Sequence, residues 1–314
     1  MVSRIAESLF WIGRHIERSD GTARILDLHL QLLLEDPWTE ENLACQSLLH
    51  LMGSAAPAGR PLTRRDVLAT LAVDRRHPAS IAYSVTAARE NAGRAREIVP
   101  TELWECLNAT SARMPRKVAE EKAHDFFGWV RERSALAVGI VESGVSHDEA
   151  WKFFTLGRSL EQADMTARLL ATRLLATRSL TEASGPSWTT ILRSCGAYES
   201  CLRTYRGVTS ARNAAEFLLL DRLFPRSIVF SISRAEQCLH KMQTRTDRVG
   251  VSDRVGVSDR AQRELGRIRS RLEGRPITDI LNDLSGQMDA VQEATSTASE
   301  AIGDRYFPTS TLPT

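Results

Sequence analysis

The chain repeats a fourteen-residue stretch, Gly13-Arg14-His15-Ile16-Glu17-Arg18-Ser19-Asp20-Gly21-Thr22-Ala23-Arg24-Ile25-Leu26, as Gly157-Arg158-Ser159-Leu160-Glu161-Gln162-Ala163-Asp164-Met165-Thr166-Ala167-Arg168-Leu169-Leu170. Eight of the fourteen positions are identical, at an offset of 144 residues. A second match, at an offset of 147, pairs Asp74-Arg75, Pro78, Ser80 and Ile81 with Asp221-Arg222, Pro225, Ser227 and Ile228. Two collinear matches with only two copies predict a duplication rather than a solenoid. We therefore expect two halves, 1–144 and 145–314, related by a pseudo-twofold axis.

The hydrophobic residues of the repeated stretch follow a helical period. Ile12, Ile16, Ala23 and Leu26 fall on one face at about 100° per residue. Alternation of the kind that β-strands need never persists, and proline residues stand where helices should begin or end. The sequence thus predicts an all-α helical bundle, with the longest helices over 3–35 and 147–181.

Composition narrows the class of protein. The chain has 314 residues, of which 42% are hydrophobic and 25% charged, as in ordinary globular proteins. The 41 basic residues nearly balance the 39 acidic ones, for a net charge of +2, so no general electrostatic attraction to nucleic acid or to an anionic membrane is expected. No stretch is long and apolar enough to span a bilayer.

The cysteine and histidine patterns indicate neither disulfides nor metal. Five cysteines form an odd set without CxxC spacing, which favours reduced thiols and a cytoplasmic protein. A single Glu-x-x-His occurs at Glu121–His124, whereas di-iron bundles need two copies and two further glutamates. We expect no metal site, no cofactor and no catalytic triad.

The repeated stretch also carries a polar stripe. Gly13, Glu17, Asp20 and Arg24 recur at i, i+4, i+7 and i+11, and again as Gly157, Glu161, Asp164 and Arg168. A glycine kept inside both helices predicts a close approach of another backbone or of a ligand. Glu17 and Asp20 need a cation from elsewhere, which Arg14, Arg158 or another arginine of the opposite half could supply. Three interpretations stay open: an ion-pair network between helices, a ligand site, or a solvated face.

A second polar cluster flanks Pro100. Arg89 and Glu90 precede this proline, and Glu105 follows it beside Trp104 and Leu107. Trp104 and Leu107 are expected in the core, with Glu105 at the surface. The alternative is that Arg89, Glu90 and Glu105 line a cleft.

A short hexapeptide repeat lies in the second half. Asp-Arg-Val-Gly-Val-Ser occurs at 247–252 and again at 253–258. Its glycines and its short period predict a flexible loop over 247–258.

Several motifs together resemble the alpha-E domain family of bacterial helical proteins. They are Ser3-Arg4-Ile5-Ala6-Glu7 through Glu17-Arg18 and Thr22-Ala23-Arg24, Ala88-Arg89-Glu90-Asn91-Ala92, Leu103-Trp104-Glu105-x-Leu107-Asn108, Trp151 through Gly157-Arg158 to Asp164, and Phe217-Leu218-Leu219-Leu220-Asp221 through Ser227. The resemblance extends almost to the end of the chain, at Arg305-Tyr306-Phe307, and the hexapeptide repeat looks like an insertion.

The resemblance implies a role beside other proteins. Members of the family are encoded next to, or fused with, a circularly permuted ATP-grasp amide ligase, often with a transglutaminase-like protein nearby. One hypothesis is a non-catalytic helical protein that docks on such a ligase or holds its peptide substrate. The other is an enzyme that acts on amides or peptides through the Glu/Asp/Arg stripe, which would need a carboxyl group with a raised pKa.

Overall fold

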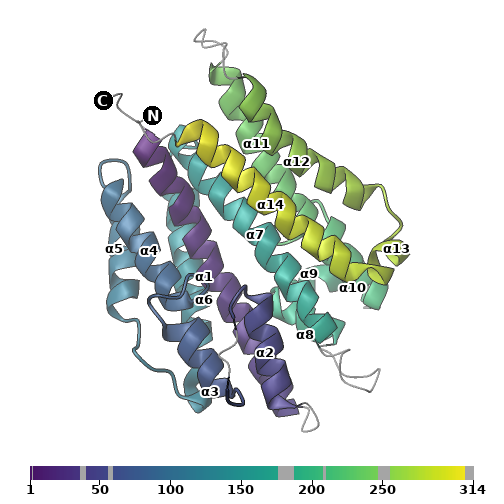
Figure 1. The fold of residues 1–314 in the computed structure, drawn as a ribbon. Coiled ribbons are helices and arrows are strands. Elements are labelled where there is room, and N and C mark those ends of the chain that lie inside the picture. Colours follow the sequence, from purple (N-terminus) through teal and green to yellow (C-terminus); the bar gives the residue numbers. More distant parts are fainter. Residues whose placement is uncertain are drawn as a thin grey trace.

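The computed structural model describes residues 1, 3–35, 40–55, 59–175, 187–207, 210–246 and 255–307. Within these ranges the chain is all-helical and contains no strand, as the sequence predicted. Long helices lie side by side along most of the molecule (Figure 1). No described helix is long and apolar enough to cross a membrane.

The first part of the chain forms one four-helix group. In it α1 packs on α4, α4 on α5, α5 on α6, and α6 back on α1. Short α2 and α3 lie between α1 and α4 in sequence, and a single π-helical turn follows α3. The bounds are α1 (Ser3–Glu35), α2 (Glu41–Leu51), α3 (Arg64–Val67), the π-helical turn (Leu68–Val73), α4 (Ile81–Arg94), α5 (Thr101–Ala112), a 3-10 turn (Glu120–Lys122) and α6 (Ala123–Gly144).

The second part forms another four-helix group in the same cyclic order. Here α7 packs on α11, α11 on α12, α12 on α14, and α14 back on α7. The bounds are α7 (Glu149–Leu175), α8 (Trp188–Ser194), α9 (Tyr198–Thr204), α10 (Ala211–Leu220), α11 (Ile228–Thr246), α12 (Val255–Glu273), α13 (Ile277–Asn282) and α14 (Leu284–Tyr306).

Helices α1 and α7 join the two groups along a long shared contact (Figure 1). They run in the same direction, because the N-terminal amine lies 3.5 Å from Glu149 at the start of α7. Their backbones come closest at two glycines. A Cβ on Gly13 would lie 2.1 Å from the carbonyl oxygen of Phe154, and a Cβ on Gly157 would lie 2.0 Å from that of Phe10. The close backbone approach expected from the repeated glycine is confirmed.

The short helices and turns also match across the two groups. Helix α2 packs on α7, whereas α8 packs on α1. The Ser80 hydroxyl donates to the carbonyl of Asp74 and accepts from the N–H of Tyr83 at the start of α4. The Ser227 hydroxyl likewise donates to the carbonyl of Asp221 and accepts from the N–H of Phe230 at the start of α11. The two matching sequence segments thus adopt the same local hydrogen bonds.

The structure divides or extends some predicted elements. The segment 188–204 forms two helices, α8 and α9, because Gly196 between them has φ +65°, a left-handed conformation that ends a helix. Of the expected loop at 247–258, residues 247–254 lie outside the described ranges. Helix α12 begins at Val255, so the last four residues of that loop are helical instead.

Candidate functional site

The repeated stripe forms reciprocal ion pairs across the α1–α7 contact. Arg14 on α1 donates from Nε to Glu161 on α7 at 2.6 Å. Arg158 on α7 donates from Nε to Glu17 on α1 at 3.3 Å. Each helix therefore presents the carboxylate that the arginine of the other helix binds. This is the ion-pair network between helices that was one of the three interpretations of the stripe.

Glu161 is the most enclosed carboxylate of the network. Its side chain is fully buried, and Arg18 binds it with two further hydrogen bonds, from Nε at 2.6 Å and Nη2 at 3.0 Å. Burial alone would raise its pKa, but Arg18 and Arg14 outweigh that effect and hold the pKa at about 2. Glu161 is thus a permanent anion that fixes two arginines.

A different arginine completes the network around Glu17. Arg226, in the turn before α11, lies 2.6 Å from Glu17 and 2.7 Å from Asp20. Burial would raise the pKa of Asp20, yet Arg226 and Arg24 together lower it. Burial would likewise lower the pKa of Arg226, but Asp20 and Glu17 raise it. Both groups therefore stay charged inside the protein.

The two remaining stripe arginines also bind helix ends. Arg24 donates from Nε to Asp20 at 2.8 Å and from Nη1 to the carbonyl of Ser194, where α8 ends, at 2.6 Å. Arg168 donates from Nε to Asp164 at 2.8 Å and from Nη1 to the carbonyl of Leu51, where α2 ends, at 2.5 Å. A cation at a helix C-terminus satisfies carbonyls that lack a partner within the helix.

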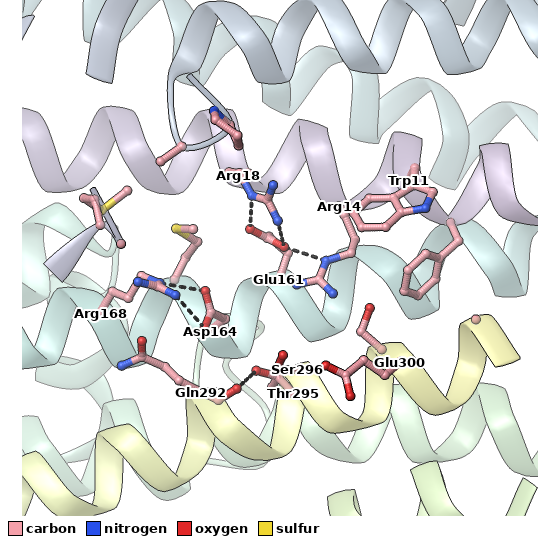
Figure 2. A pocket seen from close by; sticks show the side chains of 18 of the residues that line it. Trp11, Arg14, Arg18, Glu161, Asp164, Arg168, Gln292, Thr295, Ser296 and Glu300 are labelled. Carbon is pink, nitrogen blue, oxygen red and sulfur yellow. Dashed lines mark hydrogen bonds and ion pairs between the residues drawn. The ribbon is translucent and has the colours of Figure 1, made fainter. Parts of the chain in front are cut away.

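A cavity of about 870 Å³ lies against the Glu161 side of the network. Figure 2 shows Arg14, Arg18, Glu161, Asp164 and Arg168 on one wall and α14 on the other. The α14 wall is polar, with Gln292, Thr295, Ser296, Ser299, Glu300 and Asp304. The apolar side chains that line the cavity are Phe10, Trp11, Met52, Met165 and Phe307. This volume falls in the range of small-molecule sites, about 300–1,000 Å³.

The second polar cluster lies elsewhere. Arg89, Glu90 and Glu105 are exposed, and none of them lines the cavity. Arg89 donates to Asn108 at 2.6 Å and stands over the ring of Trp104. Leu107 is buried and Trp104 is half-buried against the core, as the simpler interpretation of this cluster predicted.

The sequence interpretation missed several residues of the site. Arg18 and Arg226 were not named as candidates, although Arg18 follows Arg14 by one helical turn. Arg226 aligns with Ala79 in the second sequence match, so a comparison of the two copies could have found it. The α14 wall had no signal, because no repeat in the sequence reaches that helix.

Comparison with known protein families assigns the fold. A family model described as "a predicted alpha-helical domain with a conserved ER motif" matches residues 1–307. The chain belongs to the Alpha-E family. A Glu-Arg dipeptide occurs at Glu17-Arg18 and again at Glu132-Arg133. The first of these lies in the buried network, where Glu17 binds Arg158 and Arg18 binds Glu161.

The similar proteins are much longer than this Alpha-E chain. Uncharacterised proteins of Mycobacterium bovis and of two strains of Mycobacterium tuberculosis are 23% identical over 255 residues. The match covers 74% of this chain but only 29% of each mycobacterial protein. No solved structure matches the chain. In the described residues, no group of three or more His, Cys, Asp or Glu side chains could hold a metal ion.

Proposed function

We propose that the chain is a non-catalytic, substrate-binding accessory of an ATP-grasp amide-ligase system for peptide synthesis or modification. The observation that carries this proposal is the cavity beside Glu161, whose wall holds arginines already fixed by buried carboxylates. Fixed charges at a concave surface bind and orient a ligand without the entropic cost of ordering long side chains.

The ionisation of the site favours binding over catalysis. General acid–base work near neutral pH needs a group whose pKa lies near that pH. Glu161 has a pKa of about 2, so it cannot supply a proton. Burial raises the pKa of all five cysteine thiols, which makes them poor nucleophiles. We therefore place the enzyme acting on amides or peptides second.

We also propose that the chain is an internal duplication, with halves 1–144 and 145–314 related by a pseudo-twofold axis. Three sets of contacts support this. The Arg14–Glu161 and Arg158–Glu17 pairs exchange equivalent residues. The Ser80 and Ser227 turns share their hydrogen bonds. The two four-helix groups have the same cyclic order of contacts.

The proposed partners are a circularly permuted ATP-grasp ligase and a transglutaminase-like protein. The support is the family resemblance and the length of the mycobacterial relatives, because the matched region makes up only 29% of each mycobacterial protein. A module that occurs inside much longer chains suits a component that works beside other domains. Five free, buried cysteines fit our proposal of a cytoplasmic protein.

Reconstitution with a circularly permuted ATP-grasp ligase, the proposed partner, tests the proposal. Amide product and ADP would be measured for the ligase alone, with the wild-type chain, and with an Ala79→Arg variant whose new side chain reaches into the cavity. We expect the wild-type chain to raise product formation and Ala79→Arg to abolish that gain. Glu90→Gln, an exposed change away from the cavity, should behave as wild type. Turnover of an amide by the isolated chain, or a ligase indifferent to the chain, would contradict the proposal.

A further inference from the structure

Arg14 and Arg158 hold equivalent places but have different partners. Arg158 contacts two carboxylates, Glu17 at 3.3 Å and Glu142 of α6 at 3.5 Å. Among the described residues, Arg14 forms an ion pair only with Glu161, through Nε, and its guanidinium lies over the rings of Phe10 and Trp11. No described residue accepts a hydrogen bond from its Nη1 or Nη2 atoms, which border the cavity. Arg158 thus has a second carboxylate partner, Glu142, whereas Arg14 has no second carboxylate partner among the described residues.

The charges on this wall of the cavity also indicate that Arg14 lacks a carboxylate partner. Arg14 and Arg18 share the single carboxylate of Glu161, which leaves one of the two positive charges without a carboxylate of its own at ion-pair distance. Arg168 contributes no excess, because Asp164 and the carbonyl of Leu51 bind it. The Arg14 side chain is only 9% exposed. Since a nearly buried cation is costly without an anion, this position favours a carboxylate from outside the chain.

Carboxylates that form no ion pair also line the cavity. Glu300 and Asp304 on α14 and Glu7 on α1 line the cavity, and none of the three forms an ion pair among the described residues. In Figure 2, Glu300 lies on α14, across the cavity from Arg14. Hydroxyl groups of Ser296 and Ser299 stand on the same wall and can donate or accept hydrogen bonds.

We propose that this cavity binds a small zwitterion, an amino acid or a short peptide with both ends free. The ligand's carboxylate binds the Nη atoms of Arg14, and its ammonium group lies among Glu300, Asp304 and Glu7. Phe10, Trp11 and Phe307 supply apolar surface for the part in between. This inference rests on the proposed function, because it names the class of substrate that the same cavity holds.

Calorimetric titration of the full chain with trialanine and two capped forms tests the inference. The free peptide keeps both charges, the C-terminal amide loses the carboxylate, and the N-acetyl form loses the ammonium. We expect trialanine to bind and each cap to weaken binding about tenfold or more, the loss typical of a hydrogen bond to a charged group.

Two variants assign each end of the ligand. Arg14→Gln leaves Glu161 with the two hydrogen bonds from Arg18, and trialanine and its amide should then bind equally weakly. Glu300→Gln changes an exposed side chain, and the preference for trialanine over its N-acetyl form should then shrink, because only Asp304 and Glu7 remain to bind the ammonium group. Glu90→Gln, exposed on α4 and outside the cavity, should retain the full preference for both free ends.

The outcomes separate this inference from the proposed function. Capped peptides that bind wild-type protein as well as trialanine, or the absence of binding by all three, would overturn the zwitterion site. Loss on amidation alone would also overturn it, in favour of a site for simple anions. In each of these cases the ligase assay with Ala79→Arg still decides the proposed function by itself.

Discussion

The two sides of the α1–α7 contact carry the same charged residues, yet one side is filled and the other is hollow. Around Glu17 and Asp20, Arg226 enters from the turn before α11 and closes the network. Around Glu161 and Asp164, the matching turn before α4 offers Ala79, which lines the cavity. The Thr166 hydroxyl donates to the carbonyl of Arg226, and the Thr22 hydroxyl to that of Ala79, so the two backbones are held alike.

One side chain therefore separates a structural site from a site that can bind. On the filled side, Arg158, Arg226 and Arg24 bind Glu17 and Asp20, and Arg158 shares Glu142 with Arg234. On the hollow side, Arg18 of α1 is the second arginine that binds Glu161, and the remaining space is the cavity. Of the two matching sites, the one with the smaller residue is the candidate for ligand binding.

The largest effect is expected from the buried carboxylates. Glu161→Gln leaves Arg14 and Arg18 buried without a counter-charge, and we expect a loss of about 3–5 kcal/mol in the free energy of unfolding. Urea unfolding measures this loss. Glu300→Gln, exposed on the opposite wall, should change the free energy by less than about 0.5 kcal/mol. Equal effects of the two changes would show that the stripe does not stabilise the fold.

A smaller loss should follow from emptying the filled side. Arg226→Ala removes the contacts to Glu17 and Asp20 but leaves each with another arginine, Arg158 and Arg24. We expect a loss of about 2–3 kcal/mol, that of hydrogen bonds to charged groups. Arg222→Ala, in the same turn, breaks an exposed pair with Glu273 and should cost at most about 1 kcal/mol. If Arg226→Ala cost no more than this control, the closing role of Arg226 would be refuted.

A third effect is spread over several pH units and is small within any one of them. His15 is buried beside the arginines of the hollow side, and burial, with Arg18 and Arg14, lowers its pKa to about 3. The folded state therefore excludes a proton that the unfolded chain accepts below about pH 6.5. The contribution of neutral His15 to the free energy of unfolding is fully present above pH 6.5. It falls as the pH is lowered towards 3, by at most about 1.4 kcal/mol per pH unit.

His15→Phe isolates that contribution. We expect the fall in unfolding free energy between pH 6.5 and 4.5 to become shallower in this variant, measured by urea midpoints at each pH. Glu161, with a pKa of about 2, stays ionised in this window. Burial also lowers the pKa of His29 to about 4, so some slope should remain. His50→Gln, an exposed change, is the control, and a His15→Phe slope as steep as this control would contradict the account.

The sequence predicted the helices and the network better than it predicted the cavity. Periodicity and the repeated glycines predicted the long helices and the close approach at Gly13 and Gly157, because both are properties of single helices and of one contact between them. The stripe indicated that Arg158 could bind Glu17, which the structure shows, whereas the pairing of Arg14 with Glu161 was not predicted. The cavity depends on what is missing, a long side chain at Ala79, and on α14, which the repeats do not reach. Such features emerge only from packing in three dimensions.

We propose that Ala79 keeps a binding site open on the Glu161 side, whereas Arg226 fills the matching space on the Glu17 side. Titration of trialanine into the wild-type chain, Ala79→Arg and Arg226→Ala distinguishes the two sides, with circular dichroism to verify that each variant is folded. We predict that Ala79→Arg folds and loses binding, because its guanidinium takes the place beside Glu161 and Asp164. Arg226→Ala should keep the wild-type affinity. Unchanged binding by Ala79→Arg, or loss of binding only in Arg226→Ala, would contradict the account.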